Sequence, residues 1–246
     1  PLCFGEATKV AGFLLEADKQ YVATLALGSQ TDTGDREGTT VRTLPVPRLT
    51  ESVVSAVLSR FVGDTLQVPP MYSALKKDGE ALYTLARRGE VVERAARPVR
   101  ITALRLLART EGSVTFEVAC SKGTYVRTLG EDIATALGTV GHLSSLRRTG
   151  VGAAFQGRAV HTLAALEALG GEEGALDGLL LPPDEALVEW CRVDLAPLEA
   201  ARFGHGQTLP VSAPEGRTRV YDGASGRFLG LAEVAAGQLV PRRLFN

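Results

Sequence analysis

One segment, Cys120 to Leu137, constrains what this chain can fold into more than any other. The residues before it, Val114 to Cys120, alternate apolar and polar side chains, as a half-buried β-strand does. After a short polar stretch, apolar residues recur at helical spacing until Gly138 interrupts them. The sequence therefore predicts a strand that turns directly into a helix, with Lys122 to Arg127 at the junction.

The junction has the side chains of a binding site. Gly123 allows the backbone to turn or to approach a ligand closely. Lys122 and Arg127 bring positive charge to the strand end, and Tyr125 adds an aromatic face. This combination suits an anionic, aromatic partner such as a nucleotide. It also suits an ordinary turn with one exposed lysine and one surface-paired arginine, and the segment alone does not decide between the two interpretations.

Length and cysteine content narrow the class of protein. The 246 residues suffice for one large domain, or one domain plus a small one. No apolar run approaches the roughly 20 residues of a membrane span, and the start lacks a signal-peptide pattern. The three cysteines show neither metal-ligand spacing nor a disulfide framework, which favours a reducing cytoplasm. Because the chain begins on Pro1 without an initiating Met, we expect the true N-terminus to lie upstream.

The charge distribution is uneven, although the formal net charge is only −1. Residues 76–109 contain nine Lys/Arg against four Asp/Glu, a local balance of +5, whereas residues 163–200 contain one Arg against nine Asp/Glu, a balance of −8. A basic segment of this kind can bind nucleic acid because the local field matters more than the total charge. The alternative is that these residues form a solvated face.

Further elements follow from local pattern. Tyr21 to Leu27 alternates as a strand, and Glu51 to Phe61 reads as a helix with Thr50 as its N-cap and Val53 on its apolar stripe. Between them, residues 29–38 form a loop rich in Thr, Asp and Gly. Asp32 and Asp35 of this loop could indicate a metal site. However, the bidentate Glu of a calcium loop is missing, and we expect no metal.

Two later stretches depart from this regular pattern. Residues 67–79 are Pro-rich and basic and contain Met71 and Tyr72, followed by a short helix from Glu80 to Arg88. The stretch suits a mobile binding loop, although Met71 and Tyr72 could instead fix it to the core. From Cys191 onward, short apolar pieces separated by glycines predict a small all-β domain.

Taken together, six segments resemble the TruB-type family of tRNA pseudouridine-55 synthases. They are GEATK at 5–9, DKQY at 18–21, LGSQTDTGDREG at 27–38, PPMYSALKKDGEALYTLAR at 69–87, CSKGTYVRTLGEDIATALG at 120–138 and HLSSLRRTGVG at 142–152. The resemblance implies an α+β fold: a mixed, largely antiparallel sheet with packed helices, then a small all-β PUA-like domain. It implies a catalytic domain over 1–190, an RNA-clamping insertion at about 63–94 that orders on binding RNA, and an RNA-binding domain over 191–246.

The resemblance also implies a reaction. Members isomerise one uridine in the T-loop of tRNA, at position 55, to pseudouridine, without a metal or organic cofactor and without an obligate protein partner. Their nucleophile is the aspartate of a GHxGxLDPxAxG motif immediately upstream of the segment that begins here at Pro1. No aspartate of this chain takes that place, since Asp32 and Asp35 belong to another motif. We therefore expect the chain to start just after its catalytic residue.

The other site residues carry over by position. Tyr21 matches the tyrosine that stacks on the target base and helps to abstract its proton, and Arg127 matches the arginine that pairs with the catalytic aspartate. An ion pair would hold that carboxylate ionised and oriented, as a nucleophile requires. The remaining substrate contacts are assigned to Tyr125 and Leu146 at the flipped nucleotide, and to Lys9 and Lys122 at phosphates.

Two other interpretations stay open on the sequence. The chain could be an RNA-binding or tRNA-folding module without catalysis in this truncated form. It could also be a guide-dependent relative that works within a ribonucleoprotein, although the uninterrupted insertion at 63–94 argues against this.

Overall fold

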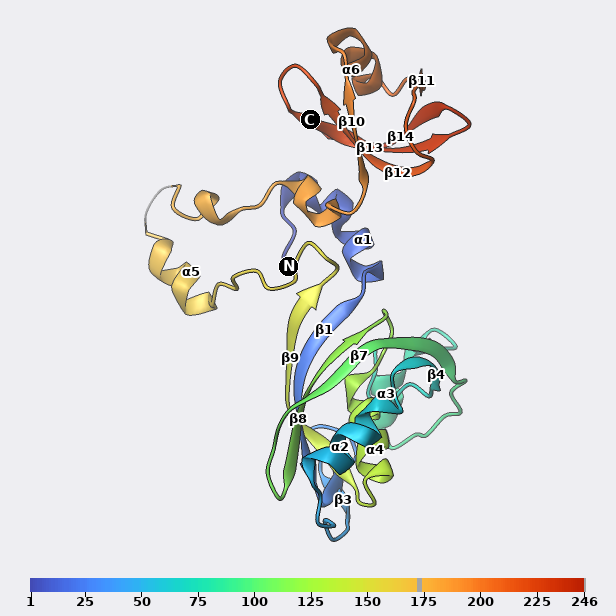
Figure 1. The fold of residues 1–246 in the computed structure, drawn as a ribbon, viewed down its shortest axis with the longest axis vertical. Coiled ribbons are helices and arrows are strands. Elements are labelled where there is room, and N and C mark those ends of the chain that lie inside the picture. Colours follow the sequence, from blue (N-terminus) through green and yellow to red (C-terminus); the bar gives the residue numbers. More distant parts are fainter. Residues whose placement is uncertain (172–173, 246) are drawn as a thin grey trace. The chain divides into compact units, whose positions relative to one another are not determined.

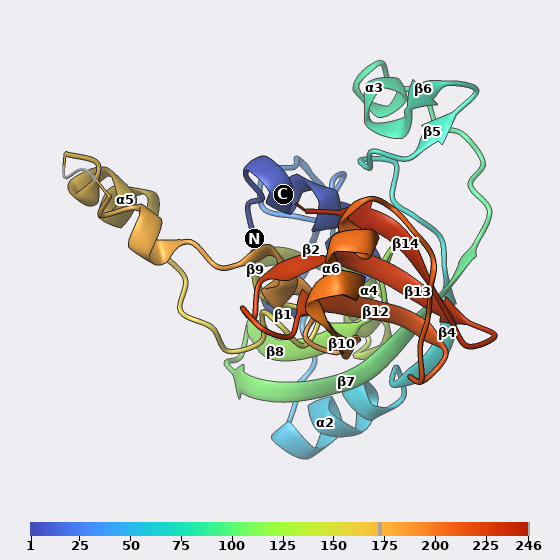
Figure 2. The same ribbon diagram turned by 90° about the horizontal axis from the view of Figure 1, so that it is seen from above.

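The computed structural model describes residues 1–171 and 174–245, and the chain forms two compact units (Figures 1 and 2). One unit contains residues 17–150, and the other combines residues 1–16 with 151–246. The domain boundary expected after residue 190 stays a prediction. Each unit is described below by itself.

The unit of residues 17–150 is built on a five-stranded sheet with the strand order β4-β7-β8-β1-β9. The pairs β4–β7, β7–β8 and β8–β1 are all antiparallel, which confirms the largely antiparallel sheet that was expected. The strands are β1 (Lys19–Leu27), β4 (Gly63–Gln67), β7 (Arg97–Arg109), β8 (Ser113–Cys120) and β9 (Gly141–Val151).

Two helices, α2 (Glu51–Ser59) and α4 (Val126–Ala136), bury their apolar sides in the same core as strands β1, β7 and β8 (Figure 1). Thr50 caps α2 as predicted, since its side chain accepts a hydrogen bond from the Val53 backbone N–H. The prediction for the Val53 side chain is wrong: it is 46% exposed, because α2 turns Val54, Val57 and Leu58 inward instead.

The chain leaves this sheet twice. Between β1 and α2 it forms a hairpin of β2 (Ser29–Thr31) and β3 (Thr40–Thr43). Between β4 and β7 it forms an excursion with β5 (Lys76–Lys77), β6 (Glu80–Ala81) and the predicted short helix α3 (Leu82–Arg87). Because β4 is paired with β7 within the sheet, the part of the chain that leaves the sheet here is residues 68–96. The RNA-clamping insertion expected at about 63–94 stays a prediction.

The second unit contains a five-stranded sheet with the order β10-β12-β13-β14-β11, which confirms the small all-β C-terminal domain (Figure 2). Its β10–β12 pair is parallel and its other pairs are antiparallel. The strands are β10 (Cys191–Leu195), β11 (Leu209–Pro210), β12 (Gly216–Asp222), β13 (Phe228–Ala235) and β14 (Gln238–Leu244).

The helical segments of this unit lie at its N-terminus and between its strands. Val10 packs with Leu187, Leu231 and Phe245, so the N-terminal segment shares a core with this domain. No helix within 1–171 and 174–245 is long and apolar enough to cross a membrane. The helices are η1 (Gly5–Val10), α1 (Ala11–Glu16), α5 (Leu163–Leu169), η2 (Asp177–Leu179), η3 (Pro183–Leu187) and α6 (Pro197–Gly204).

Candidate functional site

The junction between β8 and α4 has the predicted strand–turn–helix geometry. Strand β8 ends at Cys120, and Gly123 adopts a left-handed backbone with φ of 80°. Tyr125 is the N-cap residue of α4, which places Arg127 in the first turn of the helix. The turn thus presents both residues at one end of the sheet.

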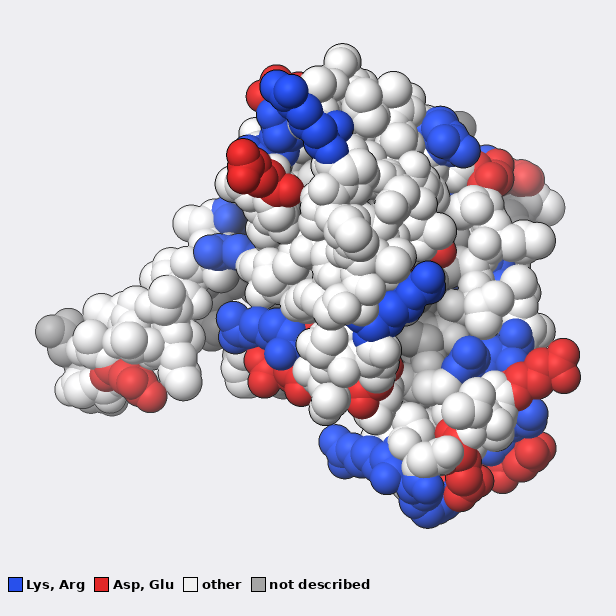
Figure 3. Space-filling model, turned by 90° about the horizontal axis from the view of Figure 1, so that it is seen from below, with Lys and Arg blue, Asp and Glu red and all other residues white. Residues whose placement is uncertain are grey.

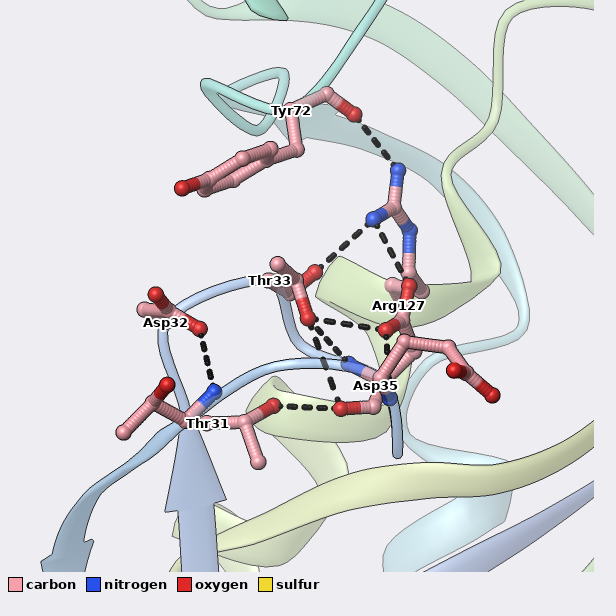
Figure 4. A network of polar contacts seen from close by, with 8 residues as sticks. Thr31, Asp32, Thr33, Asp35, Tyr72 and Arg127 are labelled. Carbon is pink, nitrogen blue, oxygen red and sulfur yellow. Dashed lines mark hydrogen bonds and ion pairs between the residues drawn. The ribbon is translucent and has the colours of Figure 1, made fainter. Parts of the chain in front are cut away.

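Three segments of the chain meet at the Arg127 guanidinium (Figure 4). Nη1 donates to the backbone oxygen of Thr33 at 2.8 Å and to Oδ2 of Asp35 at 3.0 Å. Nη2 donates to the backbone oxygen of Tyr72, in the 68–96 excursion, at 2.6 Å. The Arg127 side chain is only 21% exposed, so a half-buried cation is fixed by one carboxylate and two carbonyl groups.

Asp35 is held in place by its own loop. Its Oδ1 accepts hydrogen bonds from the Thr33 hydroxyl at 2.8 Å and from the Glu37 backbone N–H at 3.1 Å. The loop is also attached to β9, because the Leu143 N–H donates to Gly34 and the Leu143 carbonyl accepts from Arg36, each at 3.0 Å. The Asp35 carboxylate is therefore positioned for Arg127 before any ligand binds.

A second carboxylate, Glu131, lies one turn further along α4. Burial raises the pKa of Glu131, and a 3.3 Å hydrogen bond from the Gln30 amide opposes that rise. Gly34 lies against the same helix at φ of 73°, where a Cβ would be 3.4 Å from the Cβ of Arg127. The loop therefore packs directly on α4, and Asp35 is the carboxylate that forms the ion pair with Arg127.

The turn is fixed from the opposite side by Gln67, at the end of β4. The Gln67 amide donates to the backbone oxygen of Tyr125 at 3.1 Å and accepts from the Tyr125 N–H at 2.7 Å. The Gln67 residue is 6% exposed, so these two bonds satisfy a buried amide and the backbone of Tyr125 at once. Gln67 thereby sets where α4 begins and, two residues later, where Arg127 lies.

Replacing Gln67 with Ala is expected to lower turnover at this candidate site about tenfold, because unpaired polar groups at the turn cost about 1–3 kcal/mol and loosen the turn. Urea denaturation should show a loss of unfolding free energy in the same range. Thr65→Ala, at an exposed position of the same strand, is the matched control and should change neither quantity. Wild-type activity in Gln67→Ala would refute the positioning role.

Sequence reasoning missed both Asp35 and Gln67 as site residues. Asp35 was assigned to another motif, and the acidic partner of Arg127 was expected only upstream of Pro1. The available signal was the Thr/Asp/Gly composition of the loop, which typically forms side-chain-to-backbone turns. For Gln67 the signal was weaker: one polar residue where a strand meets two prolines.

Tyr21 and Leu146 lie on neighbouring strands, β1 and β9. The Tyr21 hydroxyl accepts a 3.3 Å hydrogen bond from Arg148, whose guanidinium lies 5.4 Å from the centre of the ring. The Leu146 side chain is 47% exposed. Within the described residues, no hydrogen bond or ion pair joins Tyr21 to Arg127. The roles expected for Tyr21, Tyr125 and Leu146 at the substrate stay predictions.

The two lysines expected at phosphates belong to different units. Lys122 is exposed in the turn before α4. Lys9 belongs to the other unit, where its ammonium group donates to Glu6 at 2.5 Å and to the backbone oxygen of Leu244 at 2.8 Å. Its side chain is thus engaged within its own unit, and its contact with phosphate stays a prediction. The described part of the chain contains no group of three or more His, Cys, Asp or Glu that could hold a metal ion.

The basic segment 76–109 is partly neutralised by ion pairs. Arg88 pairs with Glu80 and Glu90, and Arg100 and Arg105 pair with Asp64 and Glu117. On the face drawn in Figure 3, basic and acidic side chains accordingly lie next to one another. Ion pairs therefore offset part of the positive charge of this segment.

Known structures share this fold. A crystal structure of a Cbf5-Nop10-Gar1 complex matches with a TM-score of 0.69 at 22% identity, covering 96% of this chain and 69% of that one. A structure of an H/ACA RNP bound to a substrate RNA containing 2'-deoxyuridine matches with a TM-score of 0.70 at 20% identity, covering 97% and 69%. Because identities this low establish only the fold, the assignment to a family rests on sequence.

Three family models cover almost the whole chain. They are the TruB family pseudouridylate synthase N-terminal domain (residues 1–126), the tRNA pseudouridylate synthase B C-terminal domain (127–188) and the pseudouridine synthase II TruB C-terminal domain (191–245). The tRNA pseudouridine synthase B of Burkholderia lata is 53% identical over 99% of this chain and 76% of that protein. The tRNA pseudouridine synthase B of Hydrogenovibrio crunogenus is 47% identical over 100% and 80%. The chain belongs to the TruB family of pseudouridine synthases.

Proposed function

We propose that this protein isomerises a uridine of tRNA to pseudouridine, at position 55 of the T-loop. The observation that carries the proposal is the Arg127 guanidinium, fixed by Asp35, Thr33 and Tyr72, in a chain 47–53% identical to tRNA pseudouridine synthases B. A fixed cation at a half-buried site is what a carboxylate nucleophile needs in order to stay ionised and oriented.

The reaction requires no added atoms, because uridine and pseudouridine are isomers. The bond between C1′ of the ribose and N1 of the base breaks, the base rotates, and a bond forms between C1′ and C5. The C5 proton leaves and N1 gains a proton. We propose that the nucleophile is an aspartate encoded before Pro1, and that Arg127 holds it while Asp35 holds Arg127. Side chains alone can carry these steps, without a metal or an organic cofactor.

The substrate base has to leave its stack before it can rotate. Extrusion of a nucleotide needs an aromatic platform and an apolar wall. Tyr21, oriented by Arg148, is proposed as the platform, with Tyr125 and Leu146 as the wall. Lys122 is proposed to neutralise the RNA backbone beside the base.

Tritium release from tRNA carrying [5-³H]uridine tests the function. The protein with the residues encoded before Pro1 should release tritium from a T-loop uridine and none from a transcript with cytidine at that position. The chain from Pro1 onward should bind the tRNA but release none. Absence of release from the longer protein would refute the function, as would release from the cytidine transcript.

Purified protein without any partner is the form to assay. Activity in that form would support the proposal that no other protein and no guide RNA is required, and that the protein acts on free tRNA in the cytoplasm. Activity that appeared only on adding a guide RNA would favour the ribonucleoprotein interpretation. Salt-dependent tRNA binding without turnover in the longer protein would favour an RNA-binding module.

A further inference from the structure

The excursion of residues 68–96 forms a lobe with its own internal structure, and Figure 2 shows β5, β6 and α3 together in it. Strands β5 and β6 pair as a hairpin, and the two residues between them, Asp78 and Gly79, have positive φ values of 53° and 86°. Positive φ at both positions is the geometry of a two-residue Asp-Gly turn. Arg88, just after α3, donates to both carboxylate oxygens of Glu80 at 2.5 and 2.9 Å. The lobe is therefore held together by its own turn and its own ion pair.

The attachment of the lobe to the rest of its unit is slight. Its two ends continue into the paired strands β4 and β7. Apart from these ends, one hydrogen bond joins residues 68–96 to other described residues of the unit. It is the 2.6 Å bond from Nη2 of Arg127 to the backbone oxygen of Tyr72 (Figure 4). We call the lobe seated when this bond is formed, and the arginine of the candidate site is thus also the residue that seats the lobe.

The loop that carries Tyr72 is held on two sides. The backbone oxygen of Ser73 accepts from the Tyr83 N–H at 3.1 Å, and that of Leu75 accepts from the Leu82 N–H at 2.7 Å. Both N–H groups belong to the first turn of α3, where a helix leaves its amides without a partner of its own. The loop therefore lies between the site arginine and α3, and the Leu82 and Tyr83 amides report on its order.

The Ser73 side chain opposes this arrangement. The residue is 6% exposed, and its hydroxyl is buried without a hydrogen-bond partner among the residues that the structure describes. A hydroxyl that loses water without gaining a partner destabilises the state that buries it. A segment that is held by one hydrogen bond and opposed by one unpaired hydroxyl should be released readily.

We propose that Arg127 couples the position of the lobe to the geometry of the site. While the lobe is seated, the Tyr72 oxygen holds Nη2, and Nη1 donates to Thr33 and Asp35. When the lobe leaves, the guanidinium loses one of its three acceptors and is free to turn, so the site is fully ordered only while the lobe is seated. Ser73 acts as a positioning residue, because it sets how firmly the lobe is seated. The effect on turnover rests on the proposed function, whereas the seating of the lobe does not.

Hydrogen–deuterium exchange of the chain without RNA tests the seating. Arg127→Met removes the donor to Tyr72 and should speed exchange of the Leu82 and Tyr83 amides about tenfold or more, as expected for one lost hydrogen bond to a charged group. Exchange of the β8 amides should not change, which would exclude general unfolding. Arg109→Met, an exposed arginine of β7, is the matched control and should exchange as wild type does. Equal exchange of the two lobe amides in wild type and Arg127→Met would overturn the proposal.

Substitutions of Ser73 test the coupling from the side of the lobe. Ser73→Ala removes the unpaired hydroxyl, so exchange of the same two amides should slow about fivefold. Ser73→Leu overfills a buried position, so exchange should become faster and kcat should fall about tenfold. Ala96→Leu adds the same side chain at an exposed position of the lobe and should match wild type in both quantities. Exchange in Ser73→Ala as fast as in wild type would remove Ser73 from the positioning role.

Turnover distinguishes a positioning role from a local structural one. It is measured as tritium release by a protein that carries the proposed nucleophilic aspartate. Because Ser73 is proposed to act through Arg127, Ser73→Leu should lower kcat in the wild-type background and have no further effect in Arg127→Met. Faster exchange with wild-type kcat in Ser73→Leu would overturn the coupling, as would additive losses in the double variant. Absence of release from every variant and from wild type would refute the proposed function, and the exchange rates would still decide whether Arg127 seats the lobe.

Discussion

Arg127→Met, in a protein that carries the proposed nucleophilic aspartate, is expected to lower kcat for pseudouridine formation by about 10³-fold. Methionine keeps much of the volume of the arginine stem but supplies no charge and no N–H donors. The backbone oxygens of Thr33 and Tyr72 and the carboxylate of Asp35 would lose their shared donor. The proposed nucleophile would lose the cation that is proposed to keep it ionised, so the chemical step should fail.

Binding of tRNA should change less than about threefold in this variant, because one contact within an extended RNA interface adds little to affinity. Arg127→Lys separates the effect of charge from that of geometry. Lysine keeps the positive charge but cannot donate in two directions from a planar group, so the kcat of this variant should lie between those of the wild type and Arg127→Met. Arg109→Met, an exposed arginine of β7, should behave as wild type. Near-normal tritium release from Arg127→Met would remove Arg127 from the mechanism.

The local pattern of apolar and polar residues was sufficient to predict the strand and the helix that form much of the core. Strand β8 and helix α4 are predictable because their buried positions follow periods of two and 3.6 residues, and those periods are visible in the sequence. The N-cap at Thr50 is equally local, since the hydroxyl bonds a backbone group three residues away. The family resemblance extended these local predictions to the order of the elements and to the C-terminal domain.

Strand β4 shows where local pattern fails. Its sequence, Gly-Asp-Thr-Leu-Gln, contains one apolar residue, and that residue, Leu66, is 70% exposed. It is an edge strand held by backbone pairing to β7, and backbone pairing leaves no side-chain signature. Local pattern therefore gives no sign of β4, and the range of about 63–94 that the family resemblance implies for the insertion includes this strand.

The contacts that organise the site are long-range, which is why the sequence did not predict them. Asp35 and Arg127 are 92 residues apart, and Gln67 and Tyr125 are 58 apart. Whether a loop carboxylate meets a given arginine depends on how the loop is attached to the rest of the fold. Here the backbone hydrogen bonds between Leu143 of β9 and the 31–38 loop fix where the loop lies relative to Arg127. No periodicity in the sequence encodes these hydrogen bonds.

Asp35→Asn is expected to lower kcat by about 10²-fold and to reduce the free energy of unfolding by less than about 1 kcal/mol. Asparagine keeps the shape and an oxygen that can accept from Thr33, but it removes the negative charge opposite Arg127. The pair is partly exposed, at 21% for Arg127 and 31% for Asp35, so solvent screens much of its contribution to stability. The loss should therefore be in activity rather than in folding, because Arg127 would be free to leave its position.

Asp32→Asn is the matched control for this change. Asp32 lies in the same loop, but its carboxylate accepts from the Thr39 backbone N–H at 2.8 Å and does not contact Arg127.

Because Asp35 is proposed to act only through Arg127, the Asp35→Asn/Arg127→Met double variant should be no slower than Arg127→Met alone. Fully additive losses would contradict that dependence.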